Sequence, residues 1–202
     1  WIQHGIDKLV ENLMKEYNKK EVIVYNTVQL YRSDKLAYIK EQHEKAKVGH
    51  FKLGFKLVRG AYMEKERARS KQKKYPCPIH NNKLDCDKDY DHASKYCIDN
   101  IIDMGLCFGT HNEKSTQMII ELMKKKGIHN NDTRIYFSQL LGMSDNISFY
   151  LGKFKYNVAK YVPYGPVKEV IPYLIRRAEE NSSISGQTNR EIVRIQELIK
   201  NY

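Results

Sequence analysis

The order in which strand-like and helix-like segments follow one another constrains the fold of this chain more than any other feature. Apolar residues at helical spacing, from Ile6 to Tyr17, come first. Five β-rich segments then follow, and a helix-like segment succeeds each of them. The β-rich segments are residues 21–31, 55–62, 106–111, 135–141 and 158–162. Because alternating strands and helices form parallel βα units, we expect an α/β fold with a parallel sheet.

Capping and stop residues locate the helices between these segments. Ser33 is a candidate cap for a helix that runs to about Lys47, and Gly127 is a stop for a helix over residues 115–126. The other helices are expected after Tyr62, at 89–104, at 145–156, from Pro166 onward and around 192–199, with a polar loop over 75–87.

The last β-rich segment ends abruptly, in the sequence Lys-Tyr-Val-Pro-Tyr-Gly-Pro of residues 160–166. Pro166 suits the first turn of a helix, where the amide that it lacks has no partner. The helix that follows places Tyr173, Arg176 and Arg177 within about one turn of each other. An arginine fork binds both oxygens of a carboxylate and stays charged. A solvated basic face is the alternative, but the tyrosines and the strand end favour a site for a small carboxylate.

Composition limits the class of protein. With 202 residues, 41% of them hydrophobic, the chain can fill the core of one sizeable domain. No apolar run approaches the roughly 18 residues of a membrane span. Cys77, Cys86, Cys97 and Cys107 lack the paired spacing of a zinc site, so we expect no metal and reduced thiols in an intracellular compartment. The chain opens on Trp1 without a leader, and we expect it to be a piece of a longer protein.

The net charge of +11 raises the question of an anionic partner. The densest basic runs, residues 65–74 and 124–126, lie on helix-like segments with acidic residues among or beside them. No recognition helix, RNA-binding sheet or zinc-finger signature accompanies them. Nucleic-acid binding is therefore not favoured, whereas weak attraction to an anionic membrane surface remains open.

Polar residues recur where each β-rich segment ends. No Gly-x-Gly-x-x-Gly or Gly-x-x-x-x-Gly-Lys motif follows a strand, which argues against Rossmann and P-loop folds. In a (β/α) barrel the active site lies at the carboxyl ends of the strands. Polar residues also end strands simply because loops begin there, but their presence at all five ends favours a pocket. These residues are Asn26, Gln29, Arg59–Tyr62, Thr110–Asn112, Gln139 and Tyr161.

Taken together, these strand ends resemble the FAD-dependent proline dehydrogenase family. The matching stretches occur in the family's order and cover nearly the whole chain, except residues 75–87 and the last fifteen or so. They are residues 25–27, 56–67, 109–113, 136–145 and 160–183. The resemblance implies a modified (β/α)8 TIM-like barrel, of which this chain supplies roughly the last five βα units. Residues 1–202 would then be the C-terminal portion of a single barrel domain.

The resemblance also implies roles for individual residues. The implied catalytic residues are Lys56, Arg176 and Arg177. The implied substrate-binding residues are Arg176 and Arg177, which bind the proline carboxylate, together with Tyr161, Tyr173, Leu140, Ala61 and Tyr62. The implied FAD contacts are Asn26, Lys56, Arg59, Gly60, Ala61, Thr110 and His111, with weaker contacts from Lys83 and Glu180.

This sequence departs from part of the family at two positions. Lys56 stands where many members have an arginine that bonds the flavin's reactive ring nitrogen; lysine keeps the charge but loses the planar fork. Asn26 stands where others have a glutamine, with the same amide on a side chain one methylene shorter. The family's earlier lysine and aspartate would lie upstream of Trp1, so the pocket of this chain alone would be incomplete and one sheet edge open.

The activity implied by the resemblance is oxidation of L-proline to 1-pyrroline-5-carboxylate by hydride transfer to FAD, the first step of proline catabolism to glutamate. The implied partners are L-proline and a quinone electron acceptor, and association with a pyrroline-5-carboxylate dehydrogenase is left open. The implied location is cytoplasmic or, in a eukaryote, mitochondrial, with peripheral contact at the inner membrane left open. A catalytically incomplete relic or subunit is the main alternative. The sequence does not distinguish proline from hydroxyproline.

Overall fold

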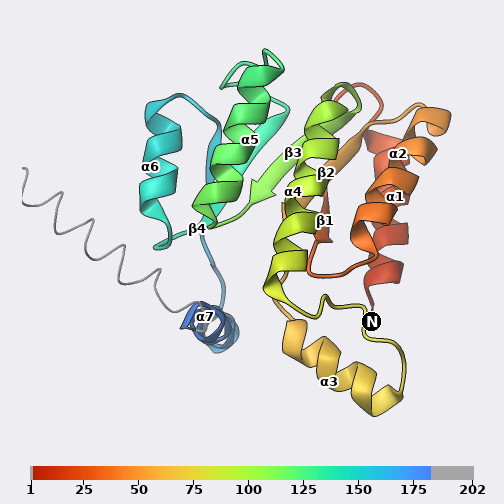
Figure 1. Cartoon of the computed structure of the whole chain (residues 1–202), viewed down its shortest axis with the longest axis vertical. Helices are drawn as coiled ribbons and strands as arrows, with labels where there is room; N and C mark the ends of the chain where they lie inside the picture. Colours follow the sequence, from red (N-terminus) through yellow and green to blue (C-terminus); the bar gives the residue numbers. More distant parts are fainter. Residues whose placement is uncertain (1, 183–202) are drawn as a thin grey trace, which may run out of the picture.

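A single parallel sheet forms the centre of the molecule (Figure 1). The computed structural model describes residues 2–182, without the side chains of Arg176 and residues 178–182, so the helix expected around 192–199 lies outside it. The strands stand in chain order, β1-β2-β3-β4-β5, and every neighbouring pair is parallel. They are β1 (Asn26–Gln29), β2 (Leu53–Val58), β3 (Met104–Gly109), β4 (Ile135–Leu140) and β5 (Val158–Tyr161). The expected parallel α/β architecture is confirmed.

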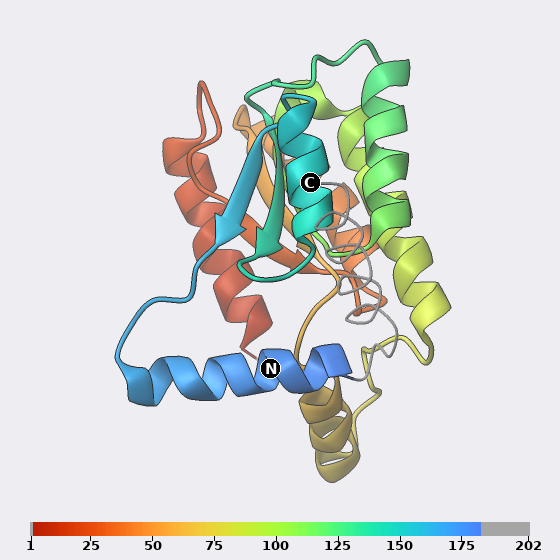
Figure 2. The same cartoon turned by 90° about the vertical axis from the view of Figure 1, so that its left-hand side faces the viewer.

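Helices alternate with the strands, as the sequence predicts. Those that run along the sheet are α1 (Gln3–Tyr17), α2 (Lys35–Gly49), α4 (Lys83–Asp99), α5 (Glu113–Lys125) and α6 (Asp145–Lys153). The other two, α3 (Met63–Lys73) and α7 (Val167–Ser182), lie beyond the carboxyl ends of the strands (Figures 1 and 2). A 3-10 turn, η1 (Ile101–Asp103), leads into β3. No helix within residues 2–182 is long and apolar enough to cross a membrane.

Buried and less buried side chains alternate along the strands, so the sheet has a core face and a second face. Leu53, Phe55 and Leu57 of β2 are completely buried, as are Leu106 and Phe108 of β3. Successive side chains point to opposite faces of a strand. The residues between them, such as Lys56 and Cys107, therefore point away from the helix-covered core.

The second face is concave. The Lys56 ammonium on β2 lies 5.6 Å from the centre of the Tyr161 ring on β5, although β3 and β4 separate the two strands. Side chains standing perpendicular to a flat sheet would be about 14 Å apart over three strand spacings. The sheet therefore curves around Lys56 and Tyr161, as expected for an arc of a barrel.

Two helix starts differ from the expectations. Helix α4 begins at Lys83, six residues before the expected start, because the Asn82 side chain caps it by accepting a 2.9 Å hydrogen bond from the Asp85 amide. The capping role expected of Ser33 is wrong. Its hydroxyl donates to the Pro78 carbonyl at 3.3 Å, and α2 begins at Lys35 without a side-chain cap.

Two segment lengths also differ. Residues 21–25 do not pair with β2, because the Asn18 side chain accepts the Ile23 and Val24 amides at 2.9 and 2.8 Å and holds them in a loop. Helix α6 ends at Lys153 and not at 156, and Lys155 adopts a left-handed backbone with φ of 60°. Both features are local contacts that hydrophobic periodicity does not reveal.

Candidate active site

Cations and aromatic rings form a continuous chain of contacts at the carboxyl ends of the strands. The Lys56 ammonium lies 5.6 Å from the ring of Tyr161, which meets Tyr173 at 6.0 Å with an interplanar angle of 64°. The Arg177 guanidinium lies 5.3 Å from the Tyr173 ring and 5.8 Å from the Tyr62 ring. Residues from β2, the β2–α3 turn, β5 and α7 are thus brought together. The structure gathers these expected site residues into one cluster.

The turn after β5 sends α7 across the strand ends, where it carries Tyr173 and Arg177 to the cluster (Figure 2). Pro166 directly precedes α7, and its carbonyl accepts the Val170 amide at 3.0 Å, which fits the expected helix start. Pro172 lies inside α7 and has no N–H, so the helical bond to the Lys168 carbonyl is missing.

The remaining candidates for the substrate site lie on different elements: Leu140 at the end of β4, Ala61 in a turn, and Arg176 and Glu180 on α7. Leu140 pairs with Tyr161 in the β4–β5 register and is half-buried on the concave face. Ala61 is half-buried in the turn between β2 and α3. The side chains of Arg176 and Glu180 lie outside the part of α7 whose side chains are described.

Asn26 does not join the cluster. Its amide is buried on the face opposite Lys56 and donates to Asp7 Oδ1 at 2.8 Å and to the Tyr38 hydroxyl at 3.0 Å. The β1–β2 register pairs Thr27 with Lys56, so Thr27 and Gln29 are the β1 residues on the concave face. Gln29, not Asn26, therefore stands on the strand face of Lys56, and its Nε2 donates to Gln3 Oε1 on α1 at 3.2 Å. Strand alternation could have distinguished the two.

A buried ion pair lies behind β1 and was not anticipated from the sequence. The Lys35 ammonium donates to Asp7 Oδ2 at 2.6 Å, and both side chains are almost fully buried. Asp7 Oδ1 also accepts from the Gln3 amide at 2.8 Å. Burial, and then the charge of Asp7, raise the pKa of Tyr38 well above its ordinary value. This network fixes α1 and α2 against β1 and so holds Gln29 in place.

Arg59, expected next to the flavin, directs its side chain into a network of protein contacts. Its guanidinium donates to Asp87 Oδ1 at 2.5 Å, to Thr110 Oγ1 at 2.9 Å and to Ser115 Oγ at 2.9 Å. It also lies 4.2 Å from the ring of Tyr90. The Arg59 side chain therefore connects the end of β2 with α4 and with the β3–α5 turn. Its backbone, rather than its side chain, is left on the concave side.

Lys83 is an exposed residue on the first turn of α4, where its ammonium contacts Asp87. Burial alone would raise the pKa of Asp87, but hydrogen bonds from Lys83 and Arg59 hold it below its ordinary value. In this structure Lys83 thus supports the carboxylate that orients Arg59.

Thr110 and His111 lie at the start of α5, where the Asn112 side chain accepts the Ser115 amide at 3.1 Å as a helix cap. His111 Nδ1 lies 2.9 Å from Ser144 Oγ. Burial, aided by the charge of Lys160, lowers the pKa of His111 to about 4, so its ring is neutral at pH 7. A helix N-terminus beside a hydroxyl and an imidazole is a suitable environment for a phosphate group.

Gly60 occupies a position that no other residue can take. Its φ is +120°, and an added Cβ would come within 1.3 Å of the Tyr31 ring. Only glycine allows the chain to turn this closely from β2 towards the cluster.

Comparison with known proteins decides the family. The sequence profile described as Proline dehydrogenase matches residues 1–190. The chain belongs to the proline dehydrogenase family. A Drosophila melanogaster relative, named mitochondrial proline dehydrogenase 1, is 39% identical over 202 residues, covering 95% of this chain and 30% of the relative. A Xenopus laevis relative named hydroxyproline dehydrogenase is 39% identical over 183 residues, covering 89% of this chain and 39% of the relative.

A solved proline utilization A structure from Bdellovibrio bacteriovorus confirms the expected fold class. It matches with a TM-score of 0.84 and 26% identity, covering 94% of this chain and 20% of the bacterial chain. The resemblance to proline dehydrogenases read from the strand-end motifs is thereby confirmed. The chain spans about a third of the length of the fly proline dehydrogenase, and its place as the C-terminal portion of a single barrel domain stays a prediction.

Proposed function

We propose that the protein containing this chain oxidises L-proline to 1-pyrroline-5-carboxylate by hydride transfer to FAD. The observation that carries this proposal is the cluster of Arg177, Tyr173, Tyr161 and Lys56 at the strand ends of a proline dehydrogenase sheet. One end of the cluster offers a guanidinium for a carboxylate, and the other offers an ammonium on the concave face.

Each member of the cluster has a distinct task in this reaction. Arg177, together with Arg176, binds the proline carboxylate and so fixes the orientation of the ring. Tyr161, Tyr173 and Tyr62 close around the apolar part of the five-membered ring and exclude water, with Leu140 and Ala61 completing the wall. The ring carbon next to the nitrogen then points towards the concave face, where it loses its hydride.

The donors on this face suit FAD, which supplies the redox chemistry when bound. Lys56 would place a positive charge beside the reduced isoalloxazine, and Gln29 would offer an amide from β1. Thr110 and His111, at the N-terminus of α5, would hold the phosphate end. Gly60 and Ala61 would contribute backbone against the ring system, whereas Lys83 and Glu180 are weaker candidates.

Acceptor and location follow from the same proposal. A quinone would take the electrons, and a pyrroline-5-carboxylate dehydrogenase would consume the product. The mitochondrial names of relatives such as the fly protein support a mitochondrial location if the source is a eukaryote. Hydroxyproline is the second candidate substrate, favoured by the relative named hydroxyproline dehydrogenase.

An anaerobic absorption spectrum of the intact protein tests the proposal. We expect a bound flavin whose visible absorption bleaches when L-proline is added, and a smaller response to hydroxyproline. The reverse order of response would assign the second substrate. A protein that cannot be loaded with FAD would identify a catalytically incomplete relic and refute the proposed function.

A further inference from the structure

The buried ion pair behind β1 is connected to the concave face by two glutamine amides. Gln3 Nε2 donates to Asp7 Oδ1 at 2.8 Å, and Gln29 Nε2 donates to Gln3 Oε1 at 3.2 Å. Gln3 lies in the first turn of α1, at the carboxyl ends of the strands (Figure 1), and Gln29 is the last residue of β1. We use the name amide relay for Asp7, Gln3 and Gln29. The relay leads from a buried carboxylate to a side chain on the strand face of Lys56.

The direction of every hydrogen bond in the amide relay follows from the Asp7 carboxylate. Its Oδ2 accepts from Lys35, and its Oδ1 accepts from Gln3 and Asn26. A carboxylate beside an ammonium has no proton to donate, so Gln3 must turn its NH2 group towards Asp7. The Gln3 carbonyl then faces Gln29, where a second carbonyl would meet it with lone pair against lone pair. Gln29 therefore turns its NH2 group towards α1 and its carbonyl oxygen away from α1.

Stability alone does not explain why this pair is charged. The side chains of Lys35 and Asp7 are only 2% and 8% exposed. Lys35 is also the first residue of α2, where the helix dipole disfavours a cation. Because burying two charges has a large desolvation cost, an apolar pair of similar volume is often as stable. An apolar pair cannot, however, fix the direction of a neighbouring amide. The charge of Asp7 thus supplies a directionality that packing does not.

We propose that Asp7 and Lys35 are positioning residues for the cofactor site, which orient Gln29 so that its carbonyl oxygen faces the bound cofactor. The proposal rests on the proposed function, because FAD is the cofactor concerned. Within the described residues, no donor is bonded to Gln29 Oε1, which leaves it available to accept from an N–H of the flavin. Asp7 and Lys35 do not touch the cofactor themselves. They act through Gln3 and Gln29.

The double variant Asp7→Asn/Lys35→Met tests the orientation without leaving a buried charge unpaired. Asn can offer either its carbonyl or its NH2 group to Gln3, so the direction of the amide relay is no longer fixed. We expect the FAD affinity of the intact protein to fall about fivefold, as for the loss of one neutral hydrogen bond. Fluorescence titration of the flavin-free protein with FAD measures this affinity.

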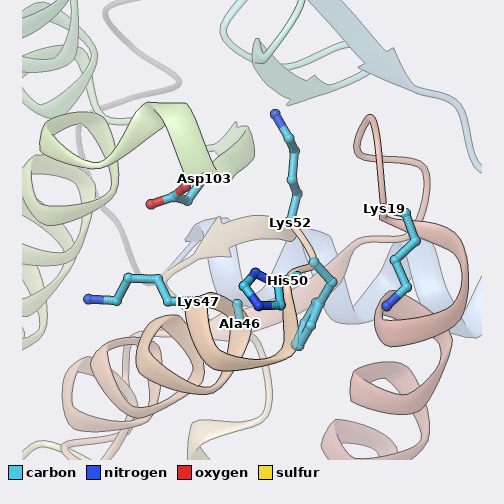
Figure 3. Close-up of a pocket in the computed structure, with 7 residues that line it drawn as sticks. Lys19, Ala46, Lys47, His50, Lys52 and Asp103 are labelled. Carbon is cyan, nitrogen blue, oxygen red and sulfur yellow. The ribbon is translucent and has the colours of Figure 1, made fainter.

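The matched control removes one charge of each sign at the other end of the sheet. Lys47 on α2 and Asp103 on η1 line a cavity of about 270 Å³ at the amino ends of the strands (Figure 3). The double variant Lys47→Met/Asp103→Asn should leave FAD affinity unchanged. An equal loss of affinity in this control would overturn the proposal, because the effect would then not come from the amide relay.

A double-mutant cycle distinguishes positioning from a general structural role. Gln29→Met removes the amide that Asp7 and Lys35 are proposed to orient. Once Gln29 is replaced, the Asp7→Asn/Lys35→Met change should lower FAD affinity no further, because the pair acts only through that side chain. A structural role of the pair would add its full effect in both backgrounds. Additive effects would therefore overturn the proposal.

The orientation itself can be measured without FAD. In a proton–nitrogen NMR spectrum of the flavin-free protein, we expect the side-chain NH2 signals of Gln3 and Gln29 to shift in Asp7→Asn/Lys35→Met and to stay in place in the control. Unchanged signals in the Asp7 and Lys35 variant would overturn the proposal. Shifted signals in a protein whose parent binds no FAD would uphold the orientation by Asp7 and Lys35 and refute the proposed function instead.

Discussion

The guanidinium of Arg177 lies 5.8 Å from the ring centre of Tyr62, although the two residues are far apart in the sequence. Tyr62 follows β2, and Arg177 lies on α7 after the last strand. Their contact joins α7 to the turn between β2 and α3 at the carboxyl ends of the strands. Under the proposed function, one side chain would both bind the carboxylate and join α7 to the β2–α3 turn.

Replacing this arginine should therefore impair catalysis sharply. We expect Arg177→Met in the intact enzyme to lower kcat/KM for L-proline, mostly by raising KM. The loss corresponds to about 2–4 kcal/mol of transition-state stabilisation, because a carboxylate loses its buried counter-charge. Steady-state kinetics measure this effect, and Lys168→Met on the exposed first turn of α7 is the control. Unchanged kcat/KM in Arg177→Met would refute the assignment.

Gly60 and Gly5 should respond oppositely to the same substitution. Gly60→Ala would force a Cβ into the Tyr31 ring at positive φ. We therefore expect the free energy of unfolding to fall by about 3 kcal/mol or more. An added Cβ at Gly5 in α1 meets nothing within 4 Å, and Gly5→Ala should stabilise by about 0.5 kcal/mol. Urea unfolding compares the two. A Gly60→Ala protein as stable as the parent would contradict the geometry.

The buried pair behind β1 should be necessary for stability. Asp7→Asn leaves the Lys35 ammonium buried without its counter-charge and should lower the free energy of unfolding by about 3 kcal/mol. Glu41→Gln, which breaks an exposed pair with Lys45, should change it little. Chemical denaturation of the two variants gives the comparison, and similar losses would show that burial of the pair is unimportant.

His111 should make stability depend on pH. Its folded pKa of about 4 lies below its ordinary value of about 6.5, so the unfolded chain binds more protons between these pH values. The contribution of neutral His111 to the free energy of unfolding is fully present above about pH 6.5. It is lost as the pH falls towards 4, and the total loss is limited to about 3 kcal/mol. His111→Gln should flatten the slope in urea midpoints measured from pH 7 to 5. A variant with the parent's slope would assign the titration to other groups.

The two amides of β1 should have separable effects. Gln29→Ala should weaken FAD binding, since Gln29 shares the concave face with Lys56. Asn26→Ala should instead lower stability, because it removes a buried donor to Asp7 and Tyr38. Flavin titration and urea unfolding of both variants test the distinction. A flavin defect confined to Asn26→Ala would confirm the expectation from the sequence that Asn26 contacts FAD.

Much of the fold was predictable because its determinants are periodic. The apolar residues of β2 and β3 mark strands, and the alternation of strands with helices predicts a parallel sheet. The boundaries were less accurate because single side chains set them. Asn82 starts α4 within a polar stretch, and Asn18 holds residues 21–25 in a loop.

The site was predictable as a set of motifs but not as a geometry. Arg177, Tyr173 and Tyr161 follow from their spacing and their family resemblance, and the structure gathers them. The face occupied by Asn26 depends on strand register, which the sequence does not state. The pairing of Asp7 with Lys35 was also hidden, because charged residues on helices are ordinarily solvated.

The strand order also bears on how the protein is made. Since each strand pairs with the one synthesised before it, a polypeptide leaving the ribosome can add its βα units one after another. Of the described elements, β5 and α7 emerge after the rest. A nascent chain can therefore pair β1 to β4 before α7, which carries Arg177, has left the ribosome, and under the proposed function substrate can bind only once that helix has folded across the strand ends.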